Sequence, residues 1–587
     1  MERNDHLIRK KIYKYLFTSV LTTVALQLGN VVDAMIVGNL IGSSANAAVS
    51  AGTPFVYLLQ VAAFLMGMGG AVTIAVLLGE RDTDNAGRVM GVSLLASFVY
   101  PLIFTLLTPV TVPAYIHLMG LNGEQAEMVR QIITVYSLGM PVCSVVIAMT
   151  NMISVDNHPT LSSAMLITAN VINLTCDVLL VKFTPLGLIG STMSTIIGYA
   201  IGGLIFIPVY LKSKDRMVKP SLKGLKEHIG VIGLTCKNGL PNTMYLVMNV
   251  IKVFALNKAV VEMLGDDMLP VFAVANNTQQ ITQMFLNGIT AVIASVAGVL
   301  FGEKDYFGMR SVLHRVLVSG LSIGGIVTVL FLIAPQILAS LYGFRDPVLL
   351  PLLLRVLRIF ALSFIFYVLN CIVQNYYKVI GLTALSTLDS MLELVLLCIP
   401  LSAAGMRIFG IEGLFGALIV NELLTFAVIN LIRLVMYRQG KIQNSGFMAI
   451  PHDNEGSICD ISIQGSDASA VGASKEIERY CRENGIDDER SALLRLATEE
   501  IVANIAEYGY KAGSEKLIDI CLSKADGKIY LRFRDDGIPF DPTSYTPEDD
   551  ETHGLDLLKK LTLSMTYMRV IDLNNTIFEL DMRGNSK

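Results

Sequence analysis

The chain has no tryptophan, few charged residues and no paired cysteines. Only 16% of its 587 residues are Asp, Glu, Lys or Arg, against about 25% in an ordinary soluble domain, while 53% are hydrophobic. The eight cysteines are scattered singly without C-x-x-C spacing, so neither a zinc site nor a disulfide framework is indicated. The net charge of −4 gives no basis for nucleic-acid binding. The composition is therefore that of an apolar chain with few charged groups.

Runs of about 20 apolar residues recur through roughly the first three quarters of the chain and predict membrane-spanning helices. The first run is too long for a signal-peptide core, and no small-residue cleavage site follows it. We therefore expect this helix to be retained in the mature protein. We expect twelve spans, at 15–41, 46–78, 88–114, 127–153, 160–183, 186–211, 230–258, 268–300, 310–342, 350–377, 382–404 and 410–436.

Basic residues gather in alternate loops between these spans. Arg9, Lys10, Arg88, Lys212 and Arg438 are among those that fall on one side. Since Lys and Arg are enriched on the cytoplasmic side, the bias predicts a multi-pass protein of the plasma membrane with both termini in the cytoplasm. The even number of spans agrees with this orientation.

The apolar part repeats itself after about 220 residues, or six spans. The sequence Leu-Leu-Gly-Glu-Arg-Asp at 77–82 reappears as Leu-Phe-Gly-Glu-Lys-Asp at 300–305. Residues 1–212 and 213–438 are therefore expected to form two six-helix lobes in the same orientation, with a cleft between them. This is the shape of an alternating-access transporter. Chance similarity between apolar segments is the alternative.

Two isolated aspartates, Asp33 and Asp177, lie inside apolar spans. A carboxylate near mid-membrane costs about 2.5–3.5 kcal/mol, so such residues usually face a polar interior. Asn173 precedes Asp177 by one helical turn, and Thr195 lies at a similar depth on the next span. These oxygen-bearing side chains suit Na⁺, or a carboxylate can carry H⁺. The alternative is a set of protonated, hydrogen-bonded residues that join helices.

The second lobe does not copy this site. Lys252 falls where the repeat would place Asp33, and we expect it to extend toward a helix end. Asp389, Glu393 and Glu422 are further intramembrane acids. They are candidates for binding a cationic substrate or a second proton.

The segment N-V-V-D-A-M-I-V-G-N at 30–39, the fifth-span pattern N-L-T-C-D-V-L-L at 173–180 and the G-E-x-D loop resemble the multidrug and toxic compound extrusion (MATE) family. The resemblance covers about residues 8–440. It implies a twelve-span, two-lobe antiporter that expels small organic, often cationic, compounds in exchange for Na⁺ or H⁺. The family's cation site maps to Asp33, Asn173, Asp177 and Thr195.

Behind a polar linker at 439–457, the composition becomes that of a soluble domain, at 458–587. We expect strands at 458–464, 515–524, 528–535, 565–573 and 576–582, and helices at 473–484, 488–508 and 554–563. The fold class is thus an all-α membrane bundle followed by a two-layer α/β domain.

Three motifs of this tail resemble the ATP-binding fold shared by histidine kinases and gyrase, and most closely the anti-sigma-factor serine kinases. They are E-E-I-V-A-N at 499–504, R-D-D-G-I-P at 534–539 and H-G-L-D at 553–556. The resemblance implies that Asn504 helps to hold Mg²⁺, that Glu500 is a general base and that Asp535 contacts the adenine amino group of ATP. Gly537 and Gly554 would complete the nucleotide site.

The tail departs from that pattern twice. Pro539 replaces the second glycine of D-x-G-x-G, and the later G-x-G has become Gly554-Leu555-Asp556. A domain that kept the fold only as a protein-binding module is therefore an alternative. The chain also lacks a G-x-x-x-x-G-K-[ST] phosphate loop, which argues against the tail as a transport motor.

The leading interpretation is a cation-coupled exporter with a regulatory nucleotide-binding tail that can link it to a regulatory protein. A second interpretation makes the membrane part a receptor and the tail a serine kinase that acts on such a protein. A third is a flippase for a lipid-linked precursor.

Overall fold

The computed structural model describes residues 6–79, 82–156, 158–213, 216–222, 229–302, 305–442, 458–510, 517–525, 528–543, 564–570 and 573–581. The chain forms two compact units. The membrane unit consists of residues 20–288 and 319–431. The tail unit combines residues 432–587 with two segments from the apolar part, 1–19 and 289–318.

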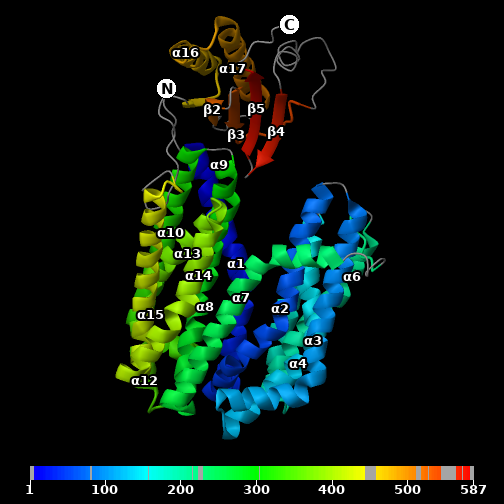
Figure 1. Cartoon of the computed structure of the whole chain (residues 1–587), viewed down its shortest axis with the longest axis vertical. Helices are drawn as coiled ribbons and strands as arrows, with labels where there is room; N and C mark the ends of the chain where they lie inside the picture. The colour runs from blue at the N-terminus through cyan, green and yellow to red at the C-terminus, as the bar shows by residue number, and fades with distance from the viewer. Residues whose placement is uncertain are drawn as a thin grey trace. The chain divides into compact units, whose positions relative to one another are not determined.

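Long helices make up the apolar part of the chain (Figure 1). The first are α1 (His6–Leu40), α2 (Ser43–Gly79), α3 (Thr83–Met119), α4 (Gly123–Val155), α5 (Pro159–Phe183), α6 (Gly187–Lys212) and α7 (Ile229–Leu264). There follow η2 (Asp266–Met268), α8 (Leu269–Val292), the π-helix η3 (Ile293–Ala297), α9 (Gly298–Gly302), α10 (Tyr306–Ile333), α11 (Pro335–Leu341), α12 (Leu350–Ala361) and α13 (Phe364–Val379). The last are α14 (Thr383–Met391), the π-helix η4 (Leu392–Leu396) and α15 (Cys398–Arg438).

Each predicted span lies on one or more of these helices. Among the described residues, eight helices are long and apolar enough to cross a membrane, or nine when α12 and α13, bent by 43°, count as one broken span. The stretch Thr383–Arg438 counts once in that number. Its backbone leaves the helical conformation at Phe409 and Gly410, at the start of the twelfth predicted span.

Within the membrane unit, α5 packs along α6, and α2 packs against α4 and α7. Gly198 permits the close approach of α5 and α6. A Cβ atom there would lie 2.4 Å from the carbonyl oxygen of Ala169 and 3.0 Å from the Cβ of Asn173. Small residues at such crossings let helix backbones meet, and here they bring the polar residues of the two helices into contact.

The tail forms a five-stranded antiparallel sheet in the order β1-β2-β3-β5-β4. Its strands are β1 (Ile458–Gln464), β2 (Leu517–Ala525), β3 (Lys528–Asp535), β4 (Ser564–Val570) and β5 (Leu573–Asp581). Two helices, α16 (Asp467–Glu483) and α17 (Asp488–Tyr508), pack on one face (Figure 1). Alternate strand residues such as Ile461, Ile520 and Phe533 are buried against them.

This arrangement confirms the predicted two-layer α/β tail. Helix α17 and strand β3 have the predicted bounds, and Asp487 caps the helix by accepting a hydrogen bond from the Arg490 amide. Helix α16 begins earlier than predicted, after the cap residue Ser466. The predicted helix 554–563 lies outside the described residues, as does most of the linker 439–457.

Candidate functional site: a buried carboxylate pair, a polar cavity and a nucleotide-like motif

The four residues predicted as a cation site lie together in the membrane unit. Asp33 comes from α1, Asn173 and Asp177 from α5, and Thr195 from α6. The Asn173 side-chain amide donates to the Thr195 hydroxyl over 3.0 Å, which ties α5 to α6. Asp33 interacts directly with Asp177, whose side chain is completely buried.

Three more polar residues belong to this site and were missed in the sequence. The Ser194 hydroxyl lies 3.4 Å from Asp177 Oδ1 and 3.0 Å from the Asn173 amide nitrogen. Ser191 interacts with both carboxylates, and Tyr136 on α4 interacts with Asp33 and Thr195. The spacing of Ser191 and Thr195, four residues apart on one helix face, was the available signal.

One oxygen of each carboxylate lacks a hydrogen-bond donor. Among the described residues, Asp33 Oδ1 and Asp177 Oδ2 are buried and accept no hydrogen bond. Buried polar atoms are rarely left in this state, because each has given up its hydration. A bound proton or a hard cation would satisfy both oxygens, and the surrounding hydroxyl, amide and carboxylate oxygens are the ligands that such cations prefer.

A polar cavity of about 190 Å³ lies elsewhere in the membrane unit. Seven of its lining residues are Asn or Gln and three are Tyr. Its charged residues are Lys252 and Glu393. Lys252 does not reach toward a helix end as expected, because α7 continues to Leu264 and leaves it within the helix.

The three buried acids of the second half, of which Glu393 lines the cavity, have different surroundings. Glu393 lies in the π-helix η4 and interacts with Lys252 and Lys378, although no ion pair shorter than 4.0 Å joins them among the described residues. Glu422 accepts a hydrogen bond from the Asn370 amide over 2.7 Å. Both oxygens of the fully buried Asp389 accept none from the described residues.

In the tail, Asp535 lies at the end of β3, where it is buried and hydrogen-bonded. Its Oδ1 accepts hydrogen bonds from the Gly537 amide, over 2.8 Å, and from the Asn574 side chain, over 2.9 Å. Burial raises the pKa of Asp535 to about 6. Since both bonds fall on Oδ1, the second oxygen is available to a donor such as an adenine amino group.

Gly537 is required by a close backbone contact. A Cβ atom at this position would lie 2.3 Å from the carbonyl oxygen of Gly509. The next amide, of Ile538, donates to that same oxygen over 2.7 Å. Any larger residue would therefore push apart the loop that follows Asp535.

The other predicted tail residues are only partly described. On α17, the Asn504 side chain lies 3.4 Å from Glu500 Oε1, so the two share one helix face. Neither of them hydrogen-bonds to Asp535 in the described part of the tail. Gly554 lies outside the described residues.

Comparison with known proteins decides the family. The MatE family model matches residues 19–179 and 244–403, one segment in each half of the apolar part. The chain belongs to the MatE family. A model described as a histidine kinase-like ATPase domain matches residues 464–578, so this MatE-family chain carries an ATPase-like domain at its C-terminal end.

Curated relatives of this MatE-family chain are distant. It is 21% identical over 387 residues to the multidrug export protein MepA of Staphylococcus haemolyticus, covering 66% of this chain and 84% of that one. It is 22% identical over 338 residues to the probable multidrug resistance protein YoeA of Bacillus subtilis, covering 56% and 72%.

Solved structures share the fold. An inward-facing multidrug resistance MATE transporter matches with a TM-score of 0.64 and 18% identity, over 72% of this chain and all of that one. An outward-facing multidrug resistance MATE transporter matches with a TM-score of 0.57 and 19% identity, over 74% and 97%.

Proposed function

We propose that the protein is a cation-coupled antiporter that exports small organic compounds across the plasma membrane, with a regulatory nucleotide-binding tail. The observation that carries this proposal is the buried pair Asp33 and Asp177, each with an oxygen that accepts no hydrogen bond from the described residues. The similarity to MepA, which is named as a multidrug export protein, supports the direction of transport. The basic loops support cytoplasmic termini.

The coupling ion, Na⁺ or H⁺, binds between α1, α5 and α6 in this proposal. Asp33 and Asp177 supply the negative charge, while Asn173, Ser194 and Thr195 orient oxygens around it. Because an ion held by three helices favours the arrangement in which they are close, its binding and release can bias the conformation of the first lobe.

The exported compound binds in the polar cavity. Glu393 in the lining supports the expected cationic class, since its carboxylate would receive a basic nitrogen of the substrate. Lys252 and the amide groups of the lining favour compounds that also carry hydrogen-bond acceptors or an acidic group. With one lysine among its described residues, this lining gives little support to the lipid-precursor flippase, which would need several basic residues.

In the tail, Asp535 and Gly537 bind the adenine of ATP, and Gly554 is the further nucleotide-binding residue that the H-G-L-D motif implies. Asn504 would hold Mg²⁺, and Glu500 beside it would act as general base if a regulatory protein is phosphorylated. The Glu500–Asn504 contact is the observation that keeps the serine-kinase interpretation as a second candidate.

Transport by purified protein in proteoliposomes tests the proposal. Exchange of a fluorescent organic cation is measured under imposed Na⁺ and pH gradients, with wild type and Asp177→Asn. We expect Asp177→Asn to abolish the response to both gradients. Thr175→Val is the matched control, since the Thr175 hydroxyl bonds only within its own helix and is exposed. Gradient-driven transport that persists in Asp177→Asn would refute the proposal.

A further inference from the structure

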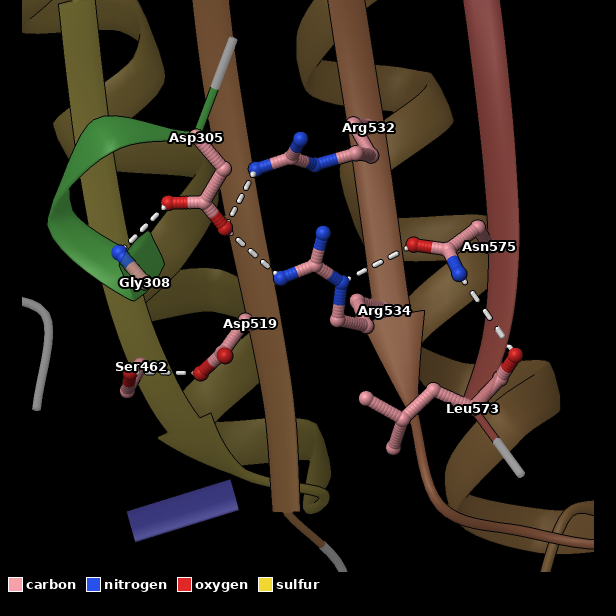
Figure 2. Close-up of polar contacts among 8 residues, drawn as sticks. All are labelled: Asp305, Gly308, Ser462, Asp519, Arg532, Arg534, Leu573 and Asn575. Carbon is pink, nitrogen blue, oxygen red and sulfur yellow. Dashed lines mark hydrogen bonds and ion pairs between the residues drawn. The ribbon is translucent and has the colours of Figure 1, made fainter. Parts of the chain in front are cut away.

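The face of the tail sheet opposite α16 and α17 carries a buried polar row. The strand registers place Ser462, Asp519, Arg534 and Asn575 opposite one another on four adjacent strands. The Ser462 hydroxyl donates to Asp519 over 2.6 Å, and Arg534 Nε donates to Asn575 Oδ1 over 2.9 Å (Figure 2). Although it faces away from the helices, Arg534 is only 1% exposed. A charge so deeply buried needs a partner of opposite sign.

That partner is Asp305, which belongs to the same compact unit and directly precedes α10. Its Oδ2 lies 2.7 Å from Arg534 Nη1 and 3.5 Å from Arg532 Nη2 (Figure 2). Its Oδ1 accepts a hydrogen bond from the Gly308 amide over 2.9 Å, in the first turn of α10. One carboxylate thus joins the start of a membrane helix to the tail sheet.

The same end of β3 reaches the predicted nucleotide site. Successive strand residues point to opposite faces, so Arg534 faces Asp305 while Asp535 faces the helices. Asn575 binds Arg534, and its neighbour Asn574 binds Asp535. The docking contact and the nucleotide-binding aspartate are therefore held by adjacent pairs of the same two strands.

A second contact flanks Asp535 on its other side. Lys10 lies 3.0 Å from Asp536 Oδ2, within the same unit. The Tyr510 hydroxyl donates to Asp536 Oδ1 over 3.0 Å. Asp535 thus lies between two residues that both contact segments from the apolar part of the chain.

The internal repeat supplies a natural reference. Asp82 occupies the position in the first lobe that Asp305 occupies in the second. It caps α3 by accepting from the Asn85 amide over 3.0 Å, much as Asp305 caps α10. Among the described residues, no ion pair within 4.0 Å joins Asp82 to an arginine. The arginine contact is therefore an addition to the cap, present in one copy of the repeat.

We propose that Asp305 is the docking residue through which the tail acts on the transporter. Nucleotide bound at Asp535 and the Asp305–Arg534 contact stabilise one another, so that nucleotide binding orders the first turn of α10. Coupling of this kind is reciprocal: docking also raises the affinity for nucleotide. This inference rests on the proposed nucleotide binding of the tail.

Hydrogen exchange of the full-length protein tests the inference, with wild type, Asp305→Asn and Asp82→Asn compared with and without ADP. Asn is as good a helix cap as Asp, so both variants keep their caps and lose only a charge. We expect Asp305→Asn to increase exchange over 306–312 and 529–535 by roughly tenfold, because it removes the carboxylate charge that lies 2.7 Å from the buried Arg534 guanidinium. Asp82→Asn should leave both segments unchanged. In wild type, ADP should slow exchange over 306–312.

The outcomes separate the inference from the proposed function. Unchanged exchange in Asp305→Asn without ADP would overturn the docking role, whatever the tail binds. Binding of fluorescent mant-ADP to wild type, without an effect on 306–312, would overturn the coupling. No mant-ADP binding to wild type would overturn the nucleotide function and the coupling with it. Asp305→Lys places a positive charge beside both arginines, so it should increase hydrogen exchange more than Asp305→Asn does. The hydrogen-exchange and mant-ADP results do not depend on whether the protein transports a substrate.

Discussion

The buried carboxylates in the two halves of the membrane part are surrounded by different kinds of side chain. In the first half, Asp33 and Asp177 are surrounded by hydroxyl and amide groups, and the described residues place no lysine or arginine in contact with them. In the second half, Glu393 shares its surroundings with Lys252 and Lys378. The described residues thus place lysine side chains near the buried carboxylates of the second half but not near those of the first half.

This difference suggests separate tasks for the two halves. Uncompensated buried carboxylates call for an ion from outside the protein. Carboxylates already facing lysine leave less need for such an ion, and they suit a cavity that recognises a charged solute.

The largest expected effect separates Asp33 from Glu422. Asp33→Asn should lower gradient-driven transport by roughly 100-fold, since it removes one of two charges that hold the coupling ion. In Glu422→Gln, the new side chain can still accept the hydrogen bond from Asn370, so gradient-driven transport should fall by less than roughly threefold. Initial rates in proteoliposomes measure both. Equal losses in the two variants would break the comparison.

Substrate recognition should respond to the cavity charges. Glu393→Gln is expected to raise KM for substrates with a basic nitrogen by roughly tenfold, without changing the dependence on Na⁺ or pH. Lys252→Met should instead weaken only substrates that carry an acidic group. Asn249→Ala, an uncharged change in the same lining, is the control. A changed ion dependence in Glu393→Gln would place coupling in the second half as well.

Asp535 extends the comparison to a buried carboxylate of the tail that has donors of its own. An ionised Asp535 is needed to accept the adenine amino group, so the Kd of mant-ADP should rise by up to roughly tenfold per pH unit below 6. Fluorescence titrations between pH 5 and pH 8 check this. In Asp535→Asn, the Kd of mant-ADP should not depend on pH in this range, and mant-ADP should bind weakly at every pH.

The same pKa fixes the sign of a stability effect. The pKa of Asp535 in the folded tail, about 6, lies above the ordinary value of 3.8. The folded state therefore binds the proton more tightly, and the stabilisation is full below pH 4 and lost as pH rises through 6. Hydrogen exchange of β3 in the full-length protein should be slower relative to Asp535→Asn at pH 5 than at pH 7.5. A difference of opposite sign would contradict the burial of this carboxyl.

The smallest expected effect concerns Ser194. Ser194→Ala removes one hydroxyl near Asp177 and should weaken the apparent affinity for the coupling ion by roughly threefold to tenfold. The apparent Kd for Na⁺, or the pH midpoint of transport, measures the change. Thr192→Val is a suitable control, because the Thr192 hydroxyl bonds only within its own helix. A loss as large as that of Asp33→Asn would mean that hydroxyl ligands matter as much as charge.

Local patterns explain what could be predicted. The apolar runs predicted the helices, and the isolated charges Asp33 and Asp177 were visible against them. In the tail, the capped start of α17 and the alternating residues of β3 fixed their bounds. The family and the ATPase-like domain followed from short motifs.

Contacts between distant segments explain what could not. Serine is common in membrane helices, so the spacing of Ser191 and Thr195 was a weak signal, and Ser194 stood out only once α5 lay against α6. The position of Lys252 depended on how far α7 continues. Asp305 and Arg534 are separated by 229 residues, and no periodicity in the sequence links them. Their pairing is a property of the folded chain alone.

The π-helix η4 has one further consequence. Its widened turn, closed by a 3.1 Å bond from the Leu397 amide to the Leu392 carbonyl, amounts to one supernumerary residue in an otherwise regular helix. Deleting a single residue such as Val395 should restore a regular α-helix here. The segments before and after the deletion would then be rotated by about 100° relative to each other around the helix axis. Homologues that differ in length by one position here would then present different chemistry to the solute, although their spans look alike in a hydropathy plot.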